Sequence, residues 1–491
     1  MSDTALASEW LPLAPAQLDF WEEHTLHPGQ TLSTVAHCTE LCGAVEEEAL
    51  CQAIAVTLAE TQAFALRFGE RHGDSPPPLR HDPQRIPSLQ RIDLQTHGDP
   101  WQAAQGLMRE DIAQHRALHS EPLAAAWLLK LGPERYLWYV RAHHILVDGF
   151  GMALIEHRCA ALYAHYRGEG SAGIPLGAFD VFQQAELAYA DSERCERDRR
   201  FWQTYLSPSQ ALPTVRKGGE AYGVRRLSVH HRLPAAVSQR LAQLAERSGI
   251  NWPDLLVALS AAWLFQVMPR CTWQGDTLPM WMPAMNRRGQ AATNVPSLAV
   301  NTLPLLVSPQ QAETLGGFLT TLTQQLRELR SHAGYRLRQL AADRGVDPGS
   351  RFFISPFINV QPFDAPRFTG CRGTRSVLAG GSGDGFNLTY RGRTDARDKS
   401  GGYRYLSGTV PGGGCAGLWR GAARIPVACA AAGSVGTAAG GPDGVARLRK
   451  RGRGMSPPEW YGFSWPATPP LRVRSCTAGA NCSPAGCRKR H

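Results

Sequence analysis

The sequence has no long apolar run and no recognisable leader. No stretch approaches the roughly 18 consecutive apolar residues of a transmembrane helix. The first residues, Met1 to Glu9, lack the basic segment and the apolar core of a secretory signal peptide. We therefore expect a protein that works in the cytoplasm and makes no contact with a membrane.

Cysteine is sparse and shows no metal-binding pattern. Seven of the 12 cysteines precede residue 391, and no two of these seven form a CxxC pair. Cys38 and Cys42 have the i,i+4 spacing of a helix, but no paired histidines accompany them. The last three, Cys476, Cys482 and Cys487, match no standard zinc-binding spacing. We expect reduced thiols and no metal site.

Acidic residues are scarce at the end of the chain. The formal charge is +10, yet residues 391–491 alone hold 17 Lys and Arg against 4 Asp and Glu. The preceding residues therefore have a net charge of −3. A basic run at 447–453 is the feature that could bind nucleic acid, and we do not expect it to do so, because a near-neutral body precedes it.

Apolar periodicity predicts helices and strands up to about residue 395. The predicted helices cover 44–58, 102–118, 152–166, 181–205, 235–247, 253–267 and 313–331, and the predicted strands cover 136–140, 296–308 and 352–361. Glycines and a proline at 168–175 predict a linker between two lobes, 1–175 and 176–395, each of the α+β class. Residues 396–491 show no sustained period, and we expect them to form a disordered tail.

The most informative pattern is His143-His144-x-x-x-Asp148-Gly149. A predicted strand delivers two adjacent histidines to a loop, and a predicted helix begins directly after it. Neighbouring side chains at a strand end point in opposite directions, so one histidine can face a cavity while the other packs. Asp148 is placed to brace the loop, and Gly149 allows a tight turn or an unusual φ before the helix. No third ligand for a metal ion is nearby.

This pattern resembles the HHxxxDG motif of the condensation domains of nonribosomal peptide synthetases. Further motifs of that family are matched over about residues 10–395. They are Leu13 to Gln17 with Trp21, Phe179 to Phe182, Val300 to Leu305 (VNTLPL), His332 to Tyr335, and Pro356 to Asn359. The phenylalanine after Gly149 and the arginine after Tyr335 are most similar to domains that open siderophore synthetases.

The resemblance implies a fold of two chloramphenicol-acetyltransferase-like lobes, arranged as a V-shaped pseudo-dimer around a tunnel. It implies that His144 is the catalytic residue within a motif completed by His143 and Gly149. It also implies that Asp148 is structural and that Asn301 lies near the tunnel. His144 either removes the proton of the attacking amine or orients the amine, and the sequence leaves both roles open.

The implied reaction joins a carrier-bound acyl thioester to a carrier-bound aminoacyl acceptor through an amide bond. No cofactor would be bound to the domain itself. Both substrates would arrive on the phosphopantetheine of donor and acceptor carrier proteins, peptidyl or aryl. We expect these carriers to act in trans, because the sequence contains no carrier or adenylation motif.

Two departures from the family pattern stand out. The family's early arginine, which pairs with the motif aspartate, is replaced here by Ala65, and Arg67 lies two residues further on. Because positions i and i+2 share a strand face, we hypothesise that Arg67 takes over the missing structural role. The family's final strand and closing helix are also missing from the pattern after about residue 395, and this predicts a truncated or frame-shifted second lobe.

Three functions remain open at this point. The first is the condensation reaction above, and the absence of the family's heterocyclisation and epimerisation motifs favours an amide-forming subtype. The second is a coenzyme A-dependent acyltransferase of the same superfamily, which would use the same histidine. The third is an inactive fragment that binds carrier proteins without catalysis.

Overall fold

The computed structural model describes residues 10–26, 33–70, 75–206, 227–268, 276–287, 289–310, 314–345, 356–381, 387–392 and 405–410, with the single residues 29, 31 and 73. Cys271, the tail cysteines and the basic run at 447–453 lie outside these residues. The six described cysteines are free thiols: Cys38, Cys42, Cys51, Cys159, Cys195 and Cys371. No helix among the described residues is long and apolar enough to cross a bilayer.

The first lobe is built on a five-stranded sheet in the order β11-β1-β6-β5-β4. Its strands are β1 (Thr34–Gly43), β4 (Leu89–Asp93), β5 (Ala124–Gly132), β6 (Arg135–His143) and β11 (Cys371–Gly380). The helices of this lobe are α1 (Pro15–Leu26), α2 (Glu47–Glu60), α3 (Pro100–Ala113) and α4 (Gly149–Tyr166). A two-stranded sheet, β2 (Leu66–Phe68) with β3 (Leu79–His81), and 3-10 turns at Gln62–Ala65 and Pro83–Arg85 complete it.

Residues 136–140 of strand β6 are buried on both faces, and this explains their unbroken run of aromatic and aliphatic side chains. Trp138 and Val140 belong to the core that includes residues of α2 and α4. Leu137 and Tyr139 point to the opposite face and belong to the core that includes residues of α3. Since side chains alternate along a strand, covering both faces with helices requires apolar residues at every position. The strand is therefore held rigidly up to the residue that opens the HHxxxDG motif.

The second lobe is built on a six-stranded sheet in the order β7-β13-β12-β10-β8-β9. These strands are β7 (Leu227–Arg232), β8 (Leu278–Ala284), β9 (Asn301–Val307), β10 (Phe357–Gln361), β12 (Asn387–Arg391) and β13 (Tyr405–Val410). Its helices are α5 (Phe179–Ala190), α6 (Glu193–Tyr205), α7 (Ala235–Ser248), α8 (Trp252–Val267), α9 (Gly289–Ala292), α10 (Leu315–Ser331) and α11 (Leu337–Asp343). One apolar core joins strands β8, β9, β10 and β12 to helices α8 and α10.

Most predicted elements are found, with local differences in their bounds. The single helix predicted over 181–205 is two helices, α5 and α6. The break occurs at Ser192, whose hydroxyl accepts a hydrogen bond of 3.2 Å from the backbone N–H of Cys195 and so caps α6. The predicted strand over 296–308 is confined to β9, because Pro296 to Val300 approach the first lobe instead.

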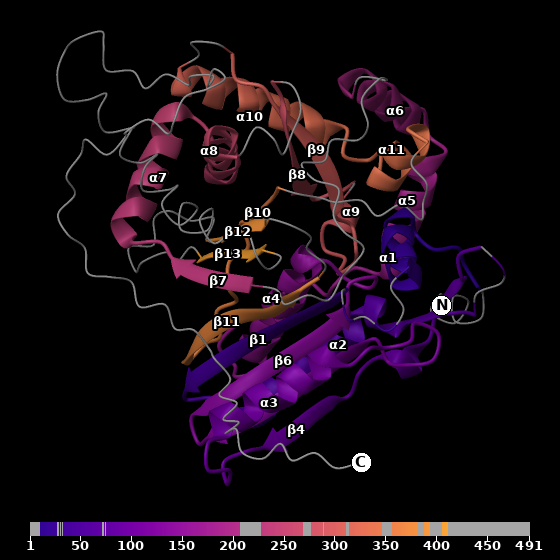
Figure 1. Ribbon diagram of the computed structural model, residues 1–491. Coiled ribbons are helices and arrows are strands. Elements are labelled where there is room, and N and C mark those ends of the chain that lie inside the picture. The colour runs from indigo at the N-terminus through magenta and orange to yellow at the C-terminus, as the bar shows by residue number, and fades with distance from the viewer. Residues whose placement is uncertain are drawn as a thin grey trace, which may run out of the picture. The chain divides into compact units, whose positions relative to one another are not determined.

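The predicted lobe boundaries need two corrections. Strand β11 lies after residue 176 in the chain but pairs antiparallel with β1, so a late segment completes the first-lobe sheet. Figure 1 shows this orange strand beside the early, indigo and violet strands. Strand β13 lies beyond residue 395 yet pairs with β12 and β7. The prediction that the whole of 396–491 stays outside the fold is therefore wrong for Tyr405–Val410, a run whose β-branched and aromatic residues favour a strand.

Candidate active site

The HHxxxDG segment leaves the end of β6 and forms the start of α4. His143 pairs with Thr34 across the sheet, and the backbone N–H of His144 donates to the carbonyl of Ser33 at 2.6 Å. From α1, the side-chain amide of Gln17 donates to the carbonyl of Ile145 at 3.2 Å. Gln17 belongs to the first of the family-like motifs, so that motif has a direct structural contact with the histidine loop.

The two histidines point to different surroundings. The ring of His144 stacks on Phe20 of α1, with ring centroids 4.5 Å apart and planes inclined by 20°. The ring of His143 instead makes an edge contact with His24, at a centroid distance of 5.7 Å. The Nδ1 atom of His143 accepts a hydrogen bond from the backbone N–H of Ile145 at 3.1 Å, which places the proton of the neutral ring on Nε2.

Both histidines favour the neutral form. Burial lowers the pKa of His144 below its ordinary value, and the opposing charge of Asp148 does not reverse this shift. Burial, followed by the neighbouring His24, holds the pKa of His143 well below its ordinary value. At neutral pH the imidazole of His144 is therefore able to accept a proton.

Asp148 is buried, and its carboxylate binds backbone and arginine rather than His144. One oxygen accepts from the backbone N–H of Gly151 at 2.8 Å and caps α4. The other accepts from the backbone N–H groups of Ala299 and Val300 at 2.9 and 3.0 Å. Burial raises the pKa of Asp148, but the Arg287 guanidinium and these N–H donors outweigh burial, so the pKa lies below its ordinary value.

The arginine that pairs with Asp148 is Arg287, which follows β8. Its two terminal nitrogens lie 3.0 and 3.1 Å from the two carboxylate oxygens, and its side chain is 1% exposed. The hypothesis that Arg67 takes this role is wrong. Arg67 lies on the two-stranded sheet β2–β3, contacts Asp82 at 3.3 Å, and is 40% exposed. The strand-face argument fails locally as well, because Ala65 ends the 3-10 turn Gln62–Ala65 and strand β2 begins only at Leu66.

Gly149, the glycine of the motif, is under no steric constraint, whereas Gly151 is. Gly149 has no left-handed φ, and an added Cβ would meet only ordinary contacts at 3.6 and 3.9 Å. At Gly151 a Cβ would lie 2.4 Å from Val147 and 3.1 Å from the backbone nitrogen of Ser297. The expectation of an unusual φ at Gly149 is therefore wrong, and the close approach of backbone occurs two residues later.

A second glycine controls the space beside His144. Gly381 follows β11, has a φ of +81°, and donates its backbone N–H to the carbonyl of Thr34 at 2.9 Å. A Cβ at this position would lie 2.5 Å from Cδ2 and 3.2 Å from Nε2 of His144. The sequence indicated only a plain turn at Gly380-Gly381-Ser382, since the contact of Gly381 with His144 depends on the pairing of β11 with β1.

Asn301, at the start of β9, is buried and holds a turn. Its amide nitrogen donates to the carbonyls of Ala333 and Tyr335 at 2.8 and 2.9 Å, and its amide oxygen accepts from Thr302 and Leu337. Asn301 thus joins two of the family-like motifs, VNTLPL and the His332–Tyr335 turn. The contacts of its side chain in the described part of the chain are with backbone atoms.

The chain matches the condensation-domain family over residues 7–369. The protein belongs to this family. Condensation domains are amide-forming acyltransferases of nonribosomal peptide synthesis that work with carrier-protein domains. The fold class predicted from the sequence, α+β with two acetyltransferase-like lobes, is confirmed by solved condensation domains.

Similar proteins include synthetases and single condensation enzymes. The chain is 31% identical over 362 residues to enterobactin synthase component F of Escherichia coli, covering 73% of this chain and 27% of that protein. It is 28% identical over 385 residues to a dimodular nonribosomal peptide synthase of Bacillus subtilis, covering 78% of this chain and 16% of that protein. The chain therefore spans about a quarter or less of the length of these relatives.

Among solved structures, VibH, a condensation enzyme of nonribosomal peptide synthesis, is 31% identical, with a TM-score of 0.74 and coverage of 85% of this chain and 95% of VibH. The first condensation domain of the calcium-dependent antibiotic synthetase is 25% identical, with a TM-score of 0.74 and coverage of 90% and 100%. Among the described residues, no group of His, Cys, Asp and Glu side chains is arranged to hold a metal ion.

Proposed function

We propose that this protein joins a carrier-bound acyl thioester to the amine of a carrier-bound aminoacyl group, and that His144 is its catalytic residue. The observation that supports this proposal best is the state of His144. Its imidazole is partly buried, favours the neutral form, rests on Phe20, and lies beside Gly381, while Asp148 is directed to Arg287. A neutral imidazole that is held in one orientation suits a proton acceptor.

The proposed reaction needs little chemical activation from the protein. The amine nitrogen attacks the thioester carbonyl carbon, the new C–N bond forms, and the C–S bond breaks. His144 takes the proton that the amine nitrogen loses and returns it to the leaving sulfur, so the donor phosphopantetheine ends as a thiol. Holding amine and thioester in line can contribute roughly 7–11 kcal/mol to the barrier reduction. His143, Asp148 and Arg287 would act as positioning residues that fix the loop carrying His144.

We also propose that the product belongs to siderophore biosynthesis and that the carriers are separate proteins. Support for the first part comes from enterobactin synthase component F and from vanchrobactin synthetase of Vibrio anguillarum, which is 24% identical over 373 residues. Support for the second part comes from the absence of carrier and adenylation motifs in the sequence, and from VibH, which is described as a condensation enzyme. The cytoplasmic location and the absence of a bound cofactor follow from this proposal and remain predictions.

The test is turnover with purified carrier proteins followed by intact-protein mass spectrometry. We expect transfer of an acyl group from a donor carrier to an aminoacyl carrier, and loss of most of this transfer in His144→Ala. His97→Ala is the matched control, because His97 is an exposed histidine of the first lobe. Normal transfer by His144→Ala would contradict the assignment of His144.

Two further arms separate the alternative functions. Transfer from free acyl-coenzyme A at an equal rate, with no carrier present, would favour the coenzyme A-dependent acyltransferase. Carrier binding without transfer, in conditions where VibH-like enzymes turn over, would favour an inactive carrier-binding fragment.

A further inference from the structure

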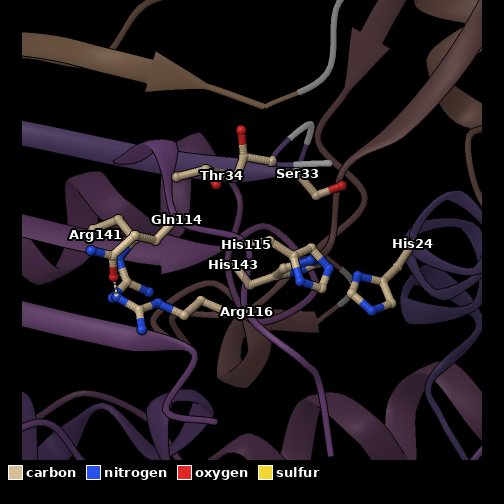
Figure 2. A pocket seen from close by; sticks show the side chains of 9 residues that line it. His24, Ser33, Thr34, Gln114, His115, Arg116, Arg141 and His143 are labelled. Carbon is tan, nitrogen blue, oxygen red and sulfur yellow. Dashed lines mark hydrogen bonds between the residues drawn. The ribbon is translucent and has the colours of Figure 1, made fainter. Parts of the chain in front are cut away.

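A small polar pocket lies beside His143, next to the candidate active site (Figure 2). It is lined by the end of α1, the start of β1, the segment after α3 and the end of β6. The pocket opens to solvent, and the space enclosed among its lining side chains has room for about one water-sized group. The lining residues are His24, Thr31, Ser33, Thr34, Gln114, His115, Arg116, Arg141 and His143.

The lining is rich in basic groups and contains no carboxylate. Three histidines and two arginines face the pocket, with no Asp or Glu among the lining residues. His24 stacks on His115 with ring centroids 5.2 Å apart, and Figure 2 shows His143 beside them. The Nε2 atom of His115 is buried and has no hydrogen-bond partner in the described part of the chain.

The positive charges of Arg116 and Arg141 are balanced by carboxylates that do not line the pocket. Arg141 makes two hydrogen bonds to Asp111, at 2.9 and 3.2 Å, and Tyr139 donates to the same carboxylate. Arg116 binds Asp111 at 3.2 Å and Glu121 at 3.5 Å.

Neither His24 nor His115 forms an ion pair with a carboxylate in the described part of the chain; Glu121, which binds Arg116, acts on His115 through its charge alone. From α1, the carboxylate of Glu23 accepts a hydrogen bond from the hydroxyl of Ser33, which lines the pocket. Burial, with His115 and then His119 as further causes, lowers the pKa of His24. His24 and His143 therefore favour the neutral form, and positive charges on neighbouring rings of the cluster would repel one another.

A bound anion would offset the repulsion between protonated imidazoles. It would accept hydrogen bonds from the imidazole N–H groups, compensate their positive charge, and so favour proton uptake by the cluster. The hydroxyls of Thr31 and Thr34 add groups able to donate to oxygen.

The pocket is also close to the reacting group. Phe20, which stacks on His144, and His24, which lines the pocket, lie four residues apart on α1. Side chains with this spacing are neighbours on one face of a helix. A group held in the pocket therefore lies about one helical turn from the imidazole that is proposed to act on the substrate.

We propose that this pocket binds a small oxyanion, a carboxylate or a phosphate-like group, through His24 and His115. The oxyanion is either an acidic group of one of the two substrates or a free anion, and the first source rests on the proposed function. In both cases anion binding is coupled to proton uptake, so affinity rises as the pH falls.

The binding test uses inorganic sulfate, whose charge stays constant between pH 6 and pH 8. Histidine ring protons are followed by nuclear magnetic resonance in the full chain, with potassium chloride as the control for ionic strength. We expect saturable shifts of the His24 and His115 signals, with affinity about tenfold or more higher at pH 6 than at pH 8. The exposed His97 should not respond.

Two conservative variants test whether the two histidines bind the anion. His115→Gln and His24→Gln should each weaken sulfate binding by about tenfold, as loss of one charge-assisted hydrogen bond predicts. Circular dichroism checks that each variant is folded. Equal shifts of His97, absence of any saturable shift, or unchanged binding in both folded variants would overturn the proposal.

A kinetic arm identifies the source of the oxyanion. A donor thioester with a terminal carboxylate is compared with its methyl ester on the same carrier. If the donor with the free carboxylate has a lower KM than its methyl ester, and His115→Gln removes this difference, the oxyanion is part of the substrate. If sulfate binds but the two donors have equal KM values, the site binds a free anion. Because sulfate binding needs no turnover, failure of catalysis counts against the proposed function, and failure of sulfate binding counts against this pocket.

Discussion

Asp148 and Arg287, which lie 139 positions apart in the sequence, form a two-point ion pair between the HHxxxDG loop and the segment after β8. The same carboxylate binds backbone N–H groups of both lobes, at Gly151 and at Ala299. The motif aspartate thus ties the start of α4 to the second lobe. Its relation to His144 is indirect, since it fixes the loop from which the histidine projects.

Arg287→Ala should be strongly destabilising. It leaves the buried Asp148 carboxylate without its cation, and removal of one partner of a buried ion pair costs about 3–5 kcal/mol. Urea unfolding at pH 7 measures the change. The double variant Asp148→Ala/Arg287→Ala should recover part of the loss, because no charge is then left unpaired. A change of less than about 1 kcal/mol in Arg287→Ala would show that the ion pair does not join the two segments.

Arg67→Ala should have a small effect on stability. Arg67 is 40% exposed and its contact with Asp82 is a surface ion pair, for which about 0–1 kcal/mol is typical. The free energy of unfolding, measured beside Arg287→Ala under the same conditions, checks this expectation. A loss as large as that of Arg287→Ala would mean that Arg67 supports the active-site loop by a route that its contacts do not show.

The contrast between these two arginines shows what the sequence could predict. The strand, loop and helix around His144 are local, and apolar periodicity together with the motif was sufficient to place them. The partner of Asp148 is distant in the sequence, and nothing near Arg287 distinguishes it from other basic residues after a strand. Gly381 was missed for the same reason, because β11 crosses from the second lobe into the first-lobe sheet.

The end of the chain gives a different lesson. The loss of a sustained apolar period after about residue 395 predicted that the fold stops, yet Tyr405–Val410 pairs with β12 and β7. Strand pairing depends on partners that local composition does not reveal. The segments on either side of these six residues lie outside the described part of the chain, so the prediction of a disordered tail stays a prediction there.

Gly151→Ala and Gly149→Ala should differ clearly in stability. The new Cβ at 151 would lie 2.4 Å from Val147 and press on the Ser297 backbone, so we expect a loss of about 1–3 kcal/mol. Gly149 lies in the first turn of α4 with room for a methyl group, and alanine there should change stability by less than about 1 kcal/mol. Thermal unfolding of the pair measures the difference. Equal stabilities would show that the loop can shift at no cost.

Gly381→Ala should reduce turnover more than stability. Its Cβ would displace the His144 ring, and its φ of +81° is unfavourable for alanine. A displacement of about 1 Å at a reacting group can cost about a hundredfold in rate. Gly380→Ala is the matched control, because a Cβ there meets no atom within 4 Å. If Gly381→Ala keeps the wild-type kcat while it is folded, the position of His144 does not depend on this glycine.

The pH dependence of turnover should show whether His144 accepts a proton. Burial lowers the pKa of His144 below 6.5, so its neutral form persists to lower pH than that of a free histidine, and a contribution from proton transfer is lost as the pH falls through the lowered pKa. The acceptor amine also ionises, and therefore the informative quantity is the ratio of wild-type to His144→Ala rates, in which ionisation of the amine cancels. We expect this ratio to be constant above about pH 7 and to fall below pH 6.5 in single-turnover measurements between pH 5 and pH 8. If His144 only orients the amine, protonation of its ring does not change the rate. A ratio that stays constant over the whole range would therefore mean that His144 orients the amine and does not take its proton.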